Sequence, residues 1–200
     1  KLVYMTSIIE FYYDFVSPYS YLAHKRIVEI KKSKKIEFLY KPILLGGLHN
    51  LLKITPAAFT KSKDKYMVED CKMVANKYKI DFIFNNKFPI NSLILMRGVL
   101  TLKEDEKDNF IKNFFDAYWG LNIDLSKEDE VNKILGKLNI NSEEFSKKIK
   151  DQKIKDKLKN LTQEAYNKEI FGAPTFVVNN KLFWGQDRLD FAIDEYEKIK

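Results

Sequence analysis

Residues 11–22 read Phe-Tyr-Tyr-Asp-Phe-Val-Ser-Pro-Tyr-Ser-Tyr-Leu, and the hydrophobic period changes within this stretch. The apolar residues of 8–15 form a nearly continuous run, which is typical of a strand covered on both faces. From Tyr19 to Ile30 the apolar residues instead fall on one face of a helix. Ser17 and Pro18 lie between the two patterns and predict an N-cap serine followed by a proline at the first helical position.

The predicted helix start gives Ser17 two possible roles. Unpaired backbone N–H groups and the positive end of the helix dipole gather there, and they favour an anion such as a thiolate. A Ser-Pro pair before an amphipathic helix is, however, more often only a cap. Taken alone, the stretch favours the structural role.

The composition bounds the class of protein. The chain has 200 residues, is 45% hydrophobic and carries a net charge of +7, with acidic and basic residues interleaved. This length predicts one compact unit with room for an insertion. No nucleic-acid-binding motif accompanies the basic run at residues 31–35, and no apolar run approaches the roughly 20 residues that span a bilayer. We expect a soluble cytoplasmic protein that binds neither nucleic acid nor membrane.

Cysteine and histidine usage excludes several chemistries. Cys71 is the single cysteine, which excludes a disulfide framework and an internal dithiol pair. It shares a helical face with Met67 and Val74, so we expect it in the core. His24 and His49 have no cysteine or carboxylate neighbours at metal-ligand spacing, so we expect no zinc site.

The order of predicted elements defines the fold. After the first strand and helix, residues 36–40 alternate like a second strand that Pro42 closes, and 43–60 is expected to be an irregular loop. Helical stripes fill 61–170, with caps expected at Asn91 or Ser92, at Ser126 and at Asn141, and the last stripe ending near Gly172. Strands at 175–178 and 181–184 flank an Asn-Asn turn, and Asp187 is expected to cap a final helix.

This order predicts an α/β protein with a thioredoxin-like fold, β-α-β…β-β-α, and a large inserted all-helical domain. The thioredoxin-like domain is expected to be discontinuous, 1–60 and 171–200, with the helical insertion at 61–170. Pro174 directly precedes the third strand, where a proline can be cis. A cis bond there would leave the backbone groups of Ala173 free to pair with an extended ligand as an added strand.

Several motifs carry a resemblance to a known family. Residues 17–20, Ser-Pro-Tyr-Ser, have the frame of a Cys-Pro-Tyr-Cys redox motif with serine at both ends. The pattern of 11–20 resembles the glutathione-dependent branch of the DsbA-like superfamily, which includes kappa-class glutathione transferases and 2-hydroxychromene-2-carboxylate isomerases. Residues 117–120, 171–176 and 184–189 look more like the isomerases. Together these motifs favour a functional role for Ser17 over the role of a helix cap alone.

The resemblance implies a catalytic Ser17 and a glutathione site. In this family the first serine of the motif hydrogen-bonds the glutathione sulfur, and the hydroxyl and the helix start favour its thiolate. The stretch before the third strand pairs with the cysteinyl part, and the stretch after the fourth holds the γ-glutamyl end. Asp187 suits the ammonium group there, although it can also be a plain helix cap. The implied cofactor-binding residues are Ser17, Ala173, Pro174, Trp184, Gly185, Gln186 and Asp187.

The resemblance further implies a homodimer and a glutathione-dependent cis–trans isomerisation of 2-hydroxychromene-2-carboxylate or a related unsaturated aromatic acid. Two alternatives stay open. One is a kappa-like transferase that conjugates electrophiles. The other is a non-enzymatic binding protein, which is suggested by the altered loop 50–56, where Ile54 lies near the position at which relatives often carry a glutathione-contacting asparagine. Asn50 and Lys53 are the possible substitutes for that asparagine.

Overall fold

The computed structural model describes residues 8–198 and contains a four-stranded mixed sheet. Its strands are β1 (Ile9–Tyr13), β2 (Phe38–Pro42), β3 (Thr175–Val178) and β4 (Lys181–Trp184), in the order β2-β1-β3-β4. β1 runs parallel to β2 and antiparallel to β3, so that Phe11 pairs with Tyr40 on one side and with Phe176 on the other. The central strand therefore comes from one end of the chain and a neighbour of it from the other.

The side chains of β1 alternate between two hydrophobic cores. Ile9, Phe11 and Tyr13 pack in the larger core with residues of α1 (Pro18–Ser33) and α9 (Leu189–Lys198). Tyr12 packs in the smaller core with Val177 and residues of α2 (Leu45–Leu52) and α8 (Gln152–Asn167). This alternation follows from the two-residue period of a strand. It confirms the prediction of a first strand covered on both faces.

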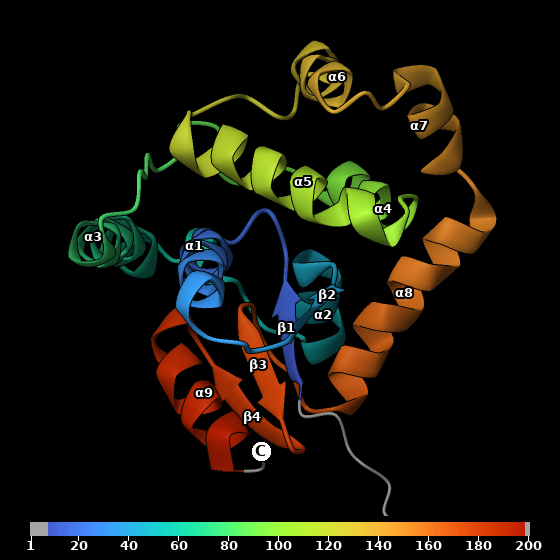
Figure 1. Ribbon diagram of the computed structural model, residues 1–200. Helices are drawn as coiled ribbons and strands as arrows, with labels where there is room; N and C mark the ends of the chain where they lie inside the picture. The colour runs from blue at the N-terminus through green and yellow to red at the C-terminus, as the bar shows by residue number, and fades with distance from the viewer. Residues whose placement is uncertain (1–7, 199–200) are drawn as a thin grey trace, which may run out of the picture.

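The helical block lies between β2 and β3 in the sequence and above the sheet in Figure 1. Its helices are α3 (Lys61–Tyr78), α4 (Leu93–Leu100), α5 (Glu104–Phe115), α6 (Glu128–Lys137), α7 (Ser142–Lys148) and α8, and a π-helical turn, Asp116–Gly120, continues α5. In Figure 1, α4 and α5 cross over the sheet, α6 and α7 lie outside them, and α8 returns to the sheet. There α8 packs against α2, α4 and β2.

The expected loop at 43–60 was wrong, because it contains α2 and a 3₁₀ turn at Ala57–Phe59. Tertiary contacts stabilise α2 despite its two glycines. Leu48 is fully buried in the smaller core, and the Leu45 N–H donates to the Asp14 carboxylate at 2.8 Å. Burial and a fixed first turn outweigh the low helix propensity of glycine.

The predicted helix ends were partly correct. Asn141 caps α7 by accepting from the Glu144 N–H at 2.9 Å, and Asn91 accepts from the Leu93 N–H at 3.0 Å at the start of α4. Ser126 does not cap α6, because its hydroxyl donates to Asp124 and Lys127 takes the cap position. α8 ends at Asn167, five residues before the expected end near Gly172. Glu169, two residues after the helix, adopts a left-handed conformation with φ 62°.

The predicted hairpin is present, with Asn179 and Asn180 at φ 50° and 59° between β3 and β4. Left-handed Asn residues of this kind make the tight turns that match strand twist. The division into domains stays a prediction, and its residues 1–7 and 199–200 lie outside the described part of the chain. Within residues 8–198, no helix combines the length and the apolar character that crossing a membrane requires.

Candidate functional site

Ser17 lies where β1 gives way to α1, and its hydroxyl makes two hydrogen bonds. The residue has extended backbone angles, and Pro18 follows at the first helical position, as predicted. The Ser17 Oγ accepts from the Ser20 N–H at 3.1 Å and donates to the Ala173 carbonyl at 3.0 Å. The hydroxyl therefore caps α1 and also reaches the C-terminal part of the sheet. Ser17 is only 4% exposed.

Ala173 lies against Ser17 just before β3. The Ala173–Pro174 peptide bond is cis, as expected, and the Pro174 carbonyl accepts from the Gly185 N–H at 2.9 Å. The Ala173 N–H has no acceptor among the described residues. A backbone donor is thus left beside Ser17 for an extended ligand to pair with.

Two cavities meet at Tyr19, Ala173 and Trp184. The first, of about 610 Å³, is lined by Ser17 and runs between the start of α2 and residues 54–59. Of the described residues that line it, none is Asp, Glu, Lys or Arg, and burial lowers the pKa of His49, which favours the neutral form of that ring. This cavity is suited to an uncharged or aromatic group.

The second cavity has a different character. It measures about 650 Å³, and polar and charged residues of two regions line it. One region is α3, with Asp70 and Lys77, and the other follows β4, with residues 185–188 and Asp190. Both signs of charge are present, so a zwitterionic ligand fits it. Ser17 lies on the apolar side of the boundary between the two cavities.

The structure brings the predicted cofactor-binding residues together. Ser17 lines the first cavity, Ala173 and Trp184 line both, and the remaining four line the second, Pro174, Gly185, Gln186 and Asp187. Gln186 is buried, and its Oε1 has no hydrogen-bond partner among the described residues. A buried acceptor without a partner is uncommon in folded proteins and indicates a place for a ligand donor.

The expectation that Asp187 caps the final helix was wrong. Gly185 takes the cap position at φ 108°, a conformation that L side chains rarely adopt, and a 3₁₀ turn at Gln186–Arg188 then leads into α9. Asp187 lies within this turn, and its largely exposed carboxylate is 3.3 Å from Arg188. Asp187 is one of the residues that line the second cavity.

Arg26 is a residue of this site that the sequence did not reveal. Although it lies on α1, its guanidinium is buried, donates to the Gln186 carbonyl at 3.0 Å and makes two bonds to Asp190 at 2.8 and 2.9 Å. It also stacks over the Tyr78 ring, 4.1 Å from the centroid. Arg26 therefore fixes the turn that carries Gln186 and Asp187 against α1 and α3. No local sequence pattern predicts the role of Arg26, because its partners are far from it in the sequence.

Asp14 and Tyr19 support the first cavity. The fully buried Asp14 carboxylate accepts from the N–H groups of Val16 and Leu45, at 3.0 and 2.8 Å, and so ties the Ser17 loop to α2. Burial raises the pKa of Asp14, against those two hydrogen bonds. The Tyr19 hydroxyl donates to Asp70 at 2.7 Å, and burial together with that carboxylate raises its pKa. Asp14 could have been recognised in the sequence as an acidic residue within the apolar run 8–15.

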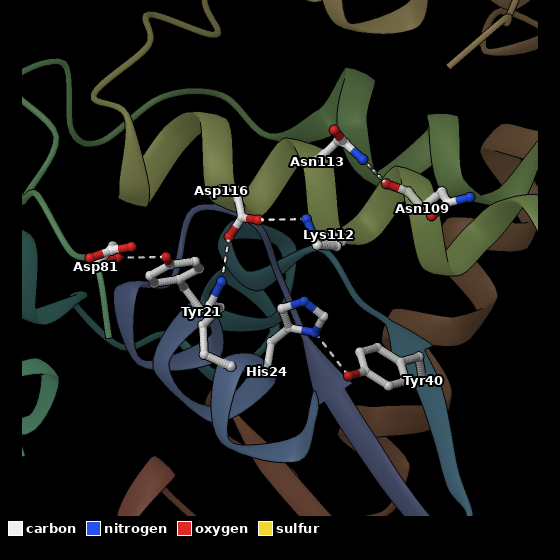
Figure 2. Close-up of polar contacts among 9 residues, drawn as sticks. Tyr21, His24, Tyr40, Asp81, Asn109, Lys112, Asn113 and Asp116 are labelled. Carbon is white, nitrogen blue, oxygen red and sulfur yellow. Dashed lines mark hydrogen bonds and ion pairs between the residues drawn. The ribbon is translucent and has the colours of Figure 1, made fainter. Parts of the chain in front are cut away.

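The remaining reactive side chains lie away from the cavities. Burial raises the pKa of the Cys71 thiol, which leaves it a core residue as predicted. His24 is buried on another face of α1, where Figure 2 shows it in contact with Tyr40. Its Nδ1 lies 2.9 Å from the Tyr40 hydroxyl, and burial lowers its pKa to about 3. Residues 8–198 contain no cluster of acidic, His or Cys side chains that could hold a metal ion.

Comparison with known proteins shows the family and the fold. Residues 8–197 match the family model described as the DSBA-like thioredoxin domain, and the chain belongs to this family, with a thioredoxin-like fold. It is 26% identical to a 2-hydroxychromene-2-carboxylate isomerase of Sphingobium xenophagum, over 94% of this chain and 96% of the relative. It is 23% identical to human glutathione S-transferase kappa 1, over 91% and 87%.

A solved structure of a 2-hydroxychromene-2-carboxylate isomerase superposes with a TM-score of 0.87 at 24% identity, covering 96% of this chain and 95% of that one. The predicted family and fold are thus confirmed. Asn50, one of the two residues that the sequence suggests as a substitute for an asparagine common in relatives, lines the first cavity. Lys53 is not among the residues that line it.

Proposed function

We propose that this protein is a glutathione-dependent isomerase that acts on 2-hydroxychromene-2-carboxylate or a related unsaturated aromatic acid. The observation that carries the proposal is the position of Ser17, which lines the apolar cavity and whose hydroxyl donates to the carbonyl of Ala173, a residue that lines both the apolar and the polar cavity. The relatives, which are named as isomerases and kappa-class transferases, support the same chemistry.

The second cavity fits glutathione. The Ala173 N–H would pair with the cysteinyl backbone, next to Pro174, as in strand addition. The unpartnered Oε1 of Gln186 and the Asp187 carboxylate would accept from the γ-glutamyl ammonium. The indole of Trp184 would separate the peptide from the apolar cavity, because it lines both.

Glutathione supplies, when bound, a thiolate that adds reversibly to a conjugated carbon and so allows rotation about the former double bond. Ser17 would turn its hydroxyl from the Ala173 carbonyl toward the sulfur position while still accepting from the Ser20 N–H. This exchange needs only a rotation of the hydroxyl hydrogen. The walls of the first cavity hold the aromatic group and exclude water from it.

One observation favours a second candidate function. The residues described around the first cavity include no cation for a substrate carboxylate, so an uncharged electrophile avoids a desolvation cost there. A kappa-like transferase that conjugates uncharged electrophiles is therefore the alternative. In that case glutathione is consumed, whereas an isomerase returns it.

The two functions separate in one set of assays. Wild-type protein is incubated with 2-hydroxychromene-2-carboxylate and limiting glutathione, and in parallel with 1-chloro-2,4-dinitrobenzene and glutathione. Many turnovers per glutathione in the first reaction support the isomerase, and a stoichiometric conjugate in the second supports the transferase. Glutathione binding without turnover in either reaction would overturn the enzymatic proposal and leave a binding protein.

A further inference from the structure

A third cavity, of about 240 Å³, lies on the other side of α2, between α2, α4 and α8. Leucine side chains from all three helices and the loop before α2 form its apolar wall, Leu44, Leu51, Leu93 and Leu158. Three basic residues also line it, Arg97 of α4 and Lys155 and Lys159 of α8. Among the described residues, no acidic side chain lines this cavity.

The three basic residues lack an ion-pair partner in the described part of the chain. None of them forms an ion pair with any residue of 8–198, although many other lysines of this chain do. Lys155 and Lys159 are one helical turn apart, a spacing at which like charges repel each other. The Nε of Arg97 is buried and has no hydrogen-bond partner in the described part of the chain. A buried guanidinium donor without an acceptor is costly and indicates a missing anion.

We propose that this cavity binds an amphipathic monoanion, a carboxylate with a short apolar tail. The carboxylate accepts from Arg97, Lys155 and Lys159, and the tail packs against the leucine wall. The volume of about 240 Å³ limits the ligand to a small molecule. The site differs from the Ser17 cavity, whose lining within residues 8–198 includes no Asp, Glu, Lys or Arg.

The wall between the two cavities provides a local reporter. Leu44 and Gly47 line both, and the Leu44 N–H donates to the Thr162 hydroxyl of α8 at 3.0 Å. A ligand in the third cavity therefore changes the surroundings of Leu158 and Thr162, which line that cavity and not the first one. A ligand in the first cavity changes those of Ser17 instead.

A titration of octanoate into the full chain tests the proposal, with binding measured by calorimetry and by changes in amide chemical shifts. Octan-1-ol is the uncharged control. We expect saturable octanoate binding with shifts at Leu158 and Thr162, and binding of octan-1-ol at least tenfold weaker. Equal affinity for the two probes, or shifts centred on Ser17, would overturn the proposal.

Charge variants complete the test. Arg97→Gln and Lys159→Gln are each expected to weaken octanoate binding about tenfold, and Lys159 is exposed, so its replacement leaves folding intact. Lys157→Gln is the matched control, because Lys157 is an exposed residue of the same helix that does not line the cavity. An equal effect of Lys157→Gln and Lys159→Gln would show that only the general charge of α8 matters, and the site would be rejected.

Discussion

Replacement of Ser17 by alanine tests the central claim about this site. The change removes a hydroxyl that caps α1 and that is placed to donate to a bound thiolate. A hydrogen bond to a charged group is worth about 1.5–3 kcal/mol, and one pKa unit corresponds to about 1.4 kcal/mol. The thiol of bound glutathione is therefore expected to have a pKa about 1–2 units higher in Ser17→Ala than in the wild type.

The assay is the ultraviolet absorbance of the thiolate, titrated with pH for glutathione bound to each protein. Ser20→Ala is the matched control, because Ser20 is a buried serine of the same turn whose hydroxyl has no partner among the described residues. Asn141→Ala controls for the lost cap. It removes an N-cap from α7 and is expected to cost about 1 kcal/mol of stability, as Ser17→Ala does, without moving the thiol pKa.

An unchanged thiol pKa in Ser17→Ala, measured at saturating glutathione, would refute the reasoning. Ser17 would then be a helix cap that happens to lie between two cavities. An equal shift in Ser17→Ala and Ser20→Ala would also count against it, because it would indicate a general rearrangement of the α1 start.

Three further changes test other parts of the structure. Gly98→Ala places a Cβ 2.5 Å from the buried Phe145 ring and is expected to lower the free energy of unfolding in urea by about 1–3 kcal/mol, whereas Gly136→Ala, with open space around it, is expected to raise it by about 0.4–1 kcal/mol. Burial lowers the pKa of His24 from 6.5 to about 3, so between these two pH values the unfolded chain binds a proton that the folded chain does not. As the pH falls from 6.5 to about 3, the stability of the wild type is therefore expected to fall relative to that of His24→Phe by about 1.4 kcal/mol per pH unit. Parallel curves of stability against pH for the two proteins would contradict this. Arg26→Met is expected to weaken glutathione binding about tenfold in calorimetry, because it releases the Gln186 turn, and a loss of stability with unchanged affinity would contradict its positioning role.

The local signals in the sequence were sufficient where one turn decides the structure. Ser17 with Pro18 predicted the start of α1, and Asn179 with Asn180 predicted the β3–β4 hairpin, because both follow from backbone preferences of a few residues. The motif resemblance predicted which residues would gather around Ser17, and the structure places them on two joined cavities.

Features that depend on distant contacts were missed. α2 forms in a glycine-containing stretch because Leu48 is buried and Asp14 holds its first turn, and neither contact is visible in residues 43–60. Arg26 resembles any helical arginine until Gln186, Asp190 and Tyr78 are placed around it. Asp187 was predicted as the cap of the final helix but lies inside the 3₁₀ turn Gln186–Arg188, which Gly185 begins and which precedes α9.

The position of β1 in the sheet has a consequence for how the protein is made. β1 is synthesised early but lies between β2 and β3, and β3 begins only at Thr175. Until that segment leaves the ribosome, one edge of an almost entirely apolar strand has no neighbour, and such an edge readily pairs with other chains. The nascent polypeptide thus has to be shielded through translation of the whole helical block, and products that stop before Thr175 are expected to accumulate as aggregates.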